Sequence, residues 1–111
     1  MARANAERRR WVVEQILAGC RSRGERLEAF FFRTQDGLEA DLLLEAGRQR
    51  EVVEIKLTSA PAPEDFARLE KVAALTNATR QVLISRTRQP VVRGRRWSVD
   101  LSGYLRAAAG G

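Results

Sequence analysis

The chain has 111 residues, of which 44% are hydrophobic and 31% are charged, a balance typical of one soluble domain and not of a disordered chain. No apolar run approaches the roughly 18 residues that span a bilayer, and no signal peptide pattern follows the basic N-terminus, so we expect a cytoplasmic protein without a membrane partner. One cysteine and no histidine exclude an internal disulfide, Ser-His-Asp catalysis and the usual zinc sites. Any metal ion would bind carboxylate oxygens, which favours magnesium, manganese or calcium.

The first half of the chain predicts a helix and then three strands. Apolar residues near a 3.6-residue spacing predict a helix over residues 6–20. Asp36-Gly37 and Gly47-Arg48 are both typical of tight hairpin turns. The strands that these turns separate are expected over residues 29–33, 38–45 and 51–57.

The second half predicts a crossover back to the same sheet. Pro63 suits the first turn of a helix over residues 63–77. A short apolar strand over residues 81–85 should then lie parallel to the third strand, with a right-handed connection. An edge strand over 95–99 and a closing helix over 102–109 complete the pattern. We expect one α/β domain over residues 1–111, with an α-β-β-β-α-β order and a mixed central sheet flanked by helices.

The turn at Gly47-Arg48 fixes which residues of the second and third strands face each other. Asp41 then lies opposite Glu54, with β-carbons roughly 4.5–5.5 Å apart. Like charges in this position destabilise a sheet unless one acid keeps its proton, a cation such as Lys56 lies beside them, or a divalent metal binds. The same register predicts that Glu39 faces Lys56 and that Glu45 faces Arg50.

The opposite face of this hairpin is expected to be a regular core. Its predicted pairs are Leu42 with Val53, Ala40 with Ile55, and Leu38 with Leu57. Trp11 and the aromatic run from Phe30 to Phe32 are also expected in the core rather than as base-stacking platforms. Cys20 is expected to be a buried small apolar residue.

The net charge of +6 comes from clustered arginines. Such clusters suit phosphate backbones, but they are also found on ordinary solvated surfaces, and charge alone leaves both interpretations open. The candidate nucleic-acid-binding residues are Arg8, Arg9, Arg10, Arg33, Arg86, Arg88, Arg93, Arg95 and Arg96.

The residues around the acid pair resemble a known signature. Asp41, followed by Glu54-Ile55-Lys56, resembles the D-x(n)-E-x-K pattern of PD-(D/E)XK nucleases, which include restriction endonucleases and archaeal Holliday junction resolvases. The run Phe32 to Asp41 resembles the Y-R-T-x-x-G-x-E-V-D stretch of one branch, the domain of unknown function at the C-terminus of many prokaryotic AAA-type ATPases. The similarity extends over most of the chain, through Trp11-Val12, the run from Glu54 to Ser59, and Val99-Asp100-Leu101.

This resemblance implies a restriction-endonuclease-like core and a phosphodiesterase that uses Mg²⁺ or Mn²⁺ to cut nucleic acid. Asp41 and Glu54 would hold the metal, and Lys56 would orient or activate the attacking water. These three residues are therefore the candidate catalytic residues. The resemblance also implies an AAA-type ATPase and a second copy of the chain, as a homodimer, as candidate partners.

Two departures from the family pattern leave an alternative open. The branch usually carries Phe-Glu where this chain has Arg8 and Arg9, and a helix glutamate often supports the metal; Glu7 and Glu14 are substitutes, with Glu14 the candidate third metal ligand. No P-loop is present, as expected for a free-standing relative or an isolated C-terminal part. The alternative function is a catalytically eroded nuclease fold that binds nucleic acid or protein beside an ATPase.

Overall fold

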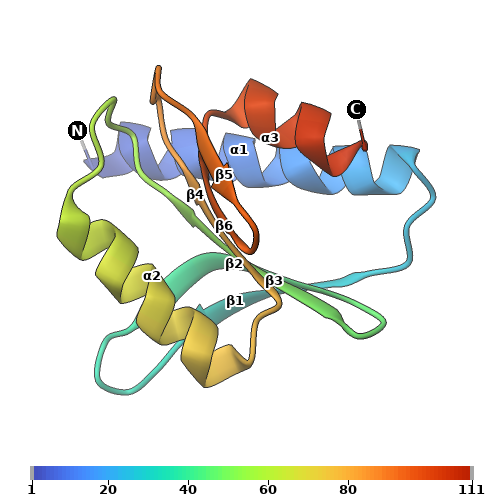
Figure 1. Cartoon of the computed structure of the whole chain (residues 1–111), viewed down its shortest axis with the longest axis horizontal. Helices are drawn as coiled ribbons and strands as arrows, with labels where there is room; N and C mark the ends of the chain where they lie inside the picture. Colours follow the sequence, from blue (N-terminus) through green and yellow to red (C-terminus); the bar gives the residue numbers. More distant parts are fainter. Residues whose placement is uncertain (1, 111) are drawn as a thin grey trace.

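A mixed sheet separates two helical layers in the computed structural model, which describes residues 2–110 (Figure 1). The first six elements follow the predicted α-β-β-β-α-β order, which confirms the α/β fold. None of the helices in these residues is long and apolar enough to cross a membrane. In chain order the elements are α1 (Ala2–Ser22), β1 (Glu28–Arg33), β2 (Glu39–Ala46), β3 (Gln49–Ile55), α2 (Pro63–Thr76), β4 (Arg80–Ile84), β5 (Val91–Arg93), β6 (Arg96–Val99) and α3 (Leu101–Ala108).

The sheet has the strand order β1-β2-β3-β4-β6-β5. The first three strands form an antiparallel meander, and β4 lies parallel to β3 after the crossover through α2, as the sequence predicts. The predicted edge strand over 95–99 is wrong in its position, because β6 lies inside the sheet, parallel to β4. The edge is β5, which sequence reasoning missed; Gly94, at φ +55°, lets the chain fold back from β5 into β6.

Two separate cores lie on the two faces of the sheet. On one face, α1 and α3 pack over the sheet through residues such as Ile16 and Tyr104. On the other face, Leu69 and Val72 of α2 pack over the sheet. The buried sheet residues of the α1–α3 face are Leu42, Leu44, Val53, Ile55, Val82, Ile84 and Val99, and those of the α2 face are Ala40, Leu43, Val52 and Leu83.

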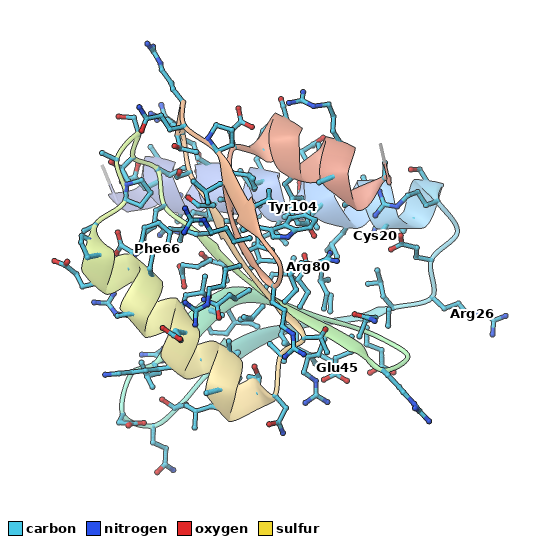
Figure 2. The ribbon with its side chains drawn as sticks, in the orientation of Figure 1. Cys20, Arg26, Glu45, Phe66, Arg80 and Tyr104 are labelled. Atoms are coloured by element: carbon cyan, nitrogen blue, oxygen red, sulfur yellow. The ribbon has the colours of Figure 1, made fainter. Side chains whose placement is uncertain are left out.

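A cluster of polar and aromatic side chains links α3 to the sheet on the α1–α3 face. The Tyr104 hydroxyl donates a hydrogen bond to Glu51, which also accepts one from Arg80 at 3.0 Å. The Arg80 guanidinium lies 4.2 Å from the centroid of the Trp97 ring, and Trp97 contacts Tyr104 edge-on. Figure 2 shows Arg80 and Tyr104 between the sheet and α3, near the buried Cys20, whose predicted burial is confirmed.

A β-bulge in β2 changes the predicted faces. The register of the β2–β3 hairpin is confirmed from Ala46–Gln49 to Leu42–Val53, with the expected ion pair between Glu45 and Arg50 (Oε1–Nε, 3.3 Å). Towards β1, however, Phe30 pairs with Leu43 and Phe32 with Ala40, so β2 carries one extra residue. A bulge of this kind reverses the alternation of side chains.

The predicted core pairs Ala40–Ile55 and Leu38–Leu57 are therefore wrong. Ala40 and Leu38 lie on the α2 face with Leu43, whereas Ile55 and Leu57 lie on the α1–α3 face. The bulge lies at the positions between Ala40 and Leu43, and this stretch includes Asp41.

The predicted burial of the aromatic residues is also wrong for Trp11, Phe30 and Phe31, which are 55%, 44% and 62% exposed. β1 is the edge strand next to β2, and within residues 2–110 neither Phe30 nor Phe31 belongs to the two cores on the faces of the sheet. Trp11 lies on α1 beside Val12, and it is Val12 that turns into the core. Phe32 is half-buried against the α2-side core.

The α3 cap provides a test of the fold. Asp100 Oδ1 accepts a hydrogen bond from the Gly103 N–H at 2.8 Å, which satisfies one free amide at the helix start. We expect Asp100→Ala to lower the free energy of unfolding by about 1 kcal/mol, measured by urea denaturation. Asp100→Asn, which can still cap, should remain close to the parent protein; equal losses in both variants would contradict this assignment.

Candidate functional site

The bulge places the Asp41 carboxylate against the backbone of β3. The β2–β3 ladder ends at Leu42–Val53, and Asp41 Oδ2 accepts a hydrogen bond from the Ile55 N–H at 2.8 Å. The side chain thus takes the place of the next backbone acceptor. Because the bulge and this hydrogen bond both fix Asp41, its carboxylate is held at the end of β3 rather than free to rotate into solvent.

Glu54 meets Asp41 on the α2 face of the sheet. It follows Val53 and precedes Ile55, which both face α1, so it points the other way. Burial, followed by a hydrogen bond to Asp41 and the charge of Asp41, raises the pKa of Glu54 to about 9; Lys56 acts in the opposite direction. At neutral pH Glu54 therefore keeps its proton and shares it with Asp41, which is one of the remedies that the sequence predicts for facing acids.

Lys56 continues the same face beyond β3. Its Nζ lies 3.8 Å from Asp65 Oδ1, while Asp65 Oδ2 accepts a hydrogen bond from the Ala62 N–H at 2.9 Å. Asp65 thus accepts a backbone hydrogen bond at the N-terminus of α2 and also lies beside Lys56. The predicted Glu39–Lys56 pair does not form; Glu39 lies near Arg33 (Oε2–Nε, 3.9 Å) because they are partners across β1 and β2.

The structure does not bring either predicted helix glutamate, Glu7 or Glu14, to the pair. Glu14 is exposed on α1, whose buried residues cover the other face of the sheet, and Glu7 lies 3.9 Å from Arg3. Within residues 2–110 no three acidic or cysteine side chains gather as a metal-binding group. Two adjacent carboxylates fit Mg²⁺ or Mn²⁺, which take one or two carboxylates and complete their shell with water and substrate oxygens. Ca²⁺, which takes six to eight oxygens, would need a larger share of its ligands from outside this pair.

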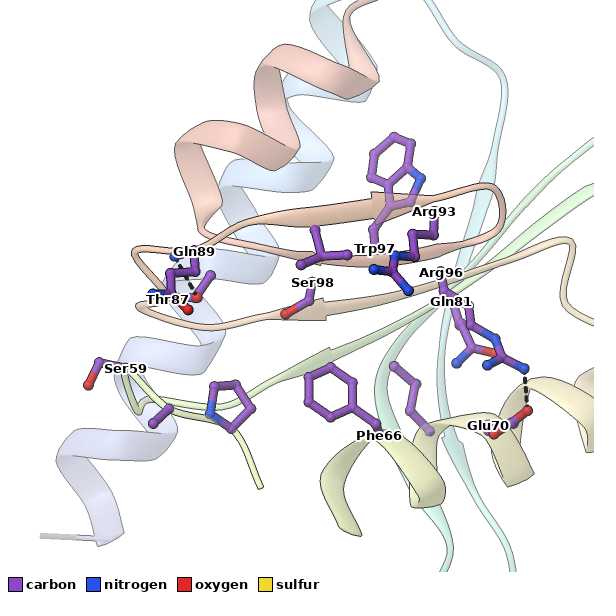
Figure 3. A pocket seen from close by; sticks show the side chains of 14 residues that line it. Ser59, Phe66, Glu70, Gln81, Thr87, Gln89, Arg93, Arg96, Trp97 and Ser98 are labelled. Carbon is purple, nitrogen blue, oxygen red and sulfur yellow. Dashed lines mark hydrogen bonds and ion pairs between the residues drawn. The ribbon is translucent and has the colours of Figure 1, made fainter. Parts of the chain in front are cut away.

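Two clefts lie on either side of the sheet, and Lys56 lines one of them. The first, which we call the strand-end cleft, has a volume of about 540 Å³ and opens where β3 and β4 end. The second, the α2 cleft, has a volume of about 610 Å³ and lies between α2 and the β5–β6 hairpin (Figure 3). The strand-end cleft is lined by Arg8, Trp11, Val12, Ile55, Lys56, Leu57, Ile84, Ser85, Arg86, Thr87, Arg88, Asp100, Leu101 and Ser102.

The α2 cleft is larger but lies apart from the acid pair. In Figure 3, Phe66 projects from α2 between that helix and the strands, and Arg96 bonds to Glu70. Its lining includes neither Asp41 nor Glu54. Chemistry at the acid pair therefore does not depend on this cleft.

The predicted arginines do not form one surface. Arg8, Arg86 and Arg88 line the strand-end cleft, whereas Arg93 and Arg96 line the α2 cleft. Arg33 lies on β1, at the opposite edge of the sheet from β5. Arg9 and Arg10 lie on α1, and Arg95 lies in the turn between β5 and β6.

Sequence reasoning missed two residues that lie at these sites. Asp65 contacts Lys56, yet its only signal was a position in the first turn of a helix that begins at Pro63. Trp11 lines the strand-end cleft, although helical spacing favoured a core position. A local sequence pattern cannot predict that a helix residue such as Trp11 or Asp65 lies beside a segment that is distant in the sequence.

One family model matches the chain, and its description is Domain of unknown function (DUF4143). The match covers residues 10–104, from Arg10 in α1 to Tyr104 in α3. The chain belongs to the DUF4143 family. The DUF4143 region contains the acid pair, Lys56 and the predicted strands of the meander. No curated protein and no solved structure matches the chain.

The proton on Glu54 in this DUF4143 domain predicts a pH-dependent stability. The folded chain holds that proton up to about pH 9, whereas the pKa of the free side chain is 4.5, so the free energy of unfolding should fall as pH rises between these values. Glu54→Gln mimics the protonated acid. We expect it to match the parent protein near pH 5 and to be more stable at pH 8, measured by urea denaturation.

The control is Glu64→Gln, because Glu64 is exposed in the first turn of α2. It should not change the pH dependence. A Glu54→Gln protein that loses as much stability with pH as the parent would contradict a proton held on Glu54.

Proposed function

We propose that this domain is a PD-(D/E)XK nuclease-like phosphodiesterase that hydrolyses nucleic acid with Mg²⁺ or Mn²⁺. The observation that supports it is the contact between Asp41 and Glu54 on adjacent strands, with Lys56 next on the same face. The D-x(n)-E-x-K spacing and the α-β-β-β-α-β order of the restriction-endonuclease-like core agree with this proposal. In this reading, residues 1–111 form a single domain of that type.

Asp41 and Glu54 would hold the cation in place of the proton that they share. When bound, the ion would supply Lewis acidity, which lowers the pKa of a water molecule and offsets charge on the phosphate. Glu54 must lose its proton for this, so cation binding should strengthen as pH rises towards its pKa. Asp41 is already fixed by the Ile55 N–H, which reduces the ordering that binding requires.

Lys56 would bind a phosphate oxygen and orient the attacking water. In the reaction the water oxygen bonds to phosphorus, one ester P–O bond breaks, and the products are a phosphomonoester and a hydroxyl group. Asp65 lies 3.8 Å from the Lys56 ammonium, which keeps this charge on the α2 side near Glu54. A compact ammonium suits this role, because it has three donors on a flexible stem.

A catalytically eroded nuclease fold, which binds nucleic acid or protein, is the alternative. Within residues 2–110 no third acid forms a metal-binding group with the pair, which favours this alternative, since fewer ligands weaken metal binding. The resemblance to ATPase-associated domains suggests an AAA-type ATPase as a partner in either case. A homodimer and a cytoplasmic location remain further parts of this proposal.

A cleavage assay distinguishes the nuclease from the eroded binding module. With Mn²⁺ and labelled single-stranded, duplex and branched DNA, the parent protein should release shorter products, and Lys56→Ala should lose at least about tenfold of that rate. Lys71→Ala, which removes the other lysine from the exposed surface of α2, should retain it. Binding of these substrates without any cleavage would contradict the enzyme and favour the alternative.

Glu54→Ala tests whether the acid pair binds a cation, by a measurement that does not require nuclease activity. The parent protein should gain thermal stability with Mn²⁺, by mass action on the folded state, and Glu54→Ala should not. In the absence of metal, at neutral pH, the variant should be as stable as the parent or more so, because alanine removes an acid that must take up a proton on folding. A Glu54→Ala protein that fails to fold would make Glu54 a structural residue and contradict this role.

A further inference from the structure

The strand-end cleft combines fixed loops with the carboxyl ends of parallel strands. The Lys56 N–H donates to the Ile84 carbonyl at 2.9 Å, and the Arg86 N–H donates to the Thr58 carbonyl at 2.8 Å. These bonds hold the segments after β3 and β4 side by side. In open α/β sheets, ligands bind outside the carboxyl ends of the strands, which is where this cleft lies.

The cleft carries an excess of positive charge. Arg8, Arg86 and Arg88 take part in none of the ion pairs that form within residues 2–110. Asp100 is the only acid in the lining, and one of its oxygens already accepts the Gly103 N–H of α3. Arginine binds phosphate with several donors at once, so three of them around one cleft favour a ligand with more than one phosphate.

Trp11 adds an aromatic surface to this charge. Its side chain is 55% exposed on α1, and it lines the cleft one helical turn from Arg8. An exposed tryptophan beside arginines suits a base that has left its helical stack, because every base presents a flat face. A base inside a duplex is covered by its neighbours and cannot stack in this way.

We propose that the strand-end cleft binds an unpaired segment of nucleic acid, with a base stacked on Trp11 and its phosphates on Arg8, Arg86 and Arg88. This inference rests on the proposed function for its choice of nucleic acid, and it narrows the substrate to single strands or unpaired ends. Lys56 lines the same cleft and also reaches Asp65 on the α2 side. A strand in the cleft would therefore lead over the end of β3 towards Glu54.

Binding is measured by fluorescence anisotropy with labelled oligothymidylate of about 12 nucleotides and a duplex of the same length. EDTA is present, so that neither cleavage nor cation binding contributes. The single strand should bind more tightly than the duplex, Trp11→Ala should weaken it on the order of tenfold, and Trp11→Phe should retain most of the affinity. Trp11 is exposed, so thermal melts should show that both variants remain folded.

The arginines have a matched control. Arg86→Ala should weaken binding and make the logarithmic salt dependence shallower by about 0.7. Arg26→Ala removes the same charge from the segment between α1 and β1, where Arg26 projects away from α3 and the N-terminal end of α1 (Figure 2), and should leave binding unchanged. Equal effects of Arg26 and Arg86 would indicate only general charge and would overturn the proposal.

Stacking also has a direct signal. The oligonucleotide should quench the intrinsic tryptophan fluorescence of the parent protein. This change should disappear in Trp11→Phe, since Trp97 packs against Arg80 and Tyr104 and does not line the strand-end cleft. Equal binding of duplex and single strand, no effect of Trp11→Ala, or binding of an acidic peptide in preference to the oligonucleotide would each overturn the proposal. If Mn²⁺ did not stabilise the parent protein, the proposed enzyme would be contradicted, but the binding result measured here in EDTA would be unchanged.

Discussion

The hydrogen bond from the Ile55 N–H to the Asp41 carboxylate organises the candidate site. The bulge in β2 adds one residue to that strand, and a side chain takes over where the backbone ladder stops. The same change sends Ala40 to the α2 face and directs Asp41 towards Glu54. In a regular hairpin the two carboxylates would face each other without a backbone hydrogen bond to orient Asp41. The bulge supplies that hydrogen bond and places Asp41 where it can share a proton with Glu54.

The conflict is reduced rather than removed. Burial beneath α2 disfavours the charged form of Glu54, and the proton that it keeps bonds to Asp41. Such a pair lowers the free energy of unfolding at neutral pH relative to uncharged side chains. Natural sequences keep destabilising pairs of this kind mainly at functional sites. A divalent ion would satisfy both oxygens at once, and Lys56, held near Asp65, adds the positive charge that a phosphate would meet.

Sequence patterns predicted the order and direction of the first strands because turns, alternation and the crossover rule act locally. They predicted the partners of Leu42 and Glu45 for the same reason. They failed at Ala40, because no residue type marks a bulge, and at β5, because three residues give too short a pattern. The exposure of Trp11 depends on what packs beside α1, which is set by the whole fold and not by helical spacing.

The two acids and the strand-end cleft lie on opposite sides of the end of β3, with Lys56 between them. The account depends on the acids forming one cation site. Calorimetric titration with Mn²⁺ tests this most directly, with Asp41→Asn as the variant and Asp36→Asn, in the exposed hairpin turn, as the control. The account predicts saturable heat in the parent and in Asp36→Asn, and none in Asp41→Asn; no binding by the parent, or equal binding by Asp41→Asn, would contradict it.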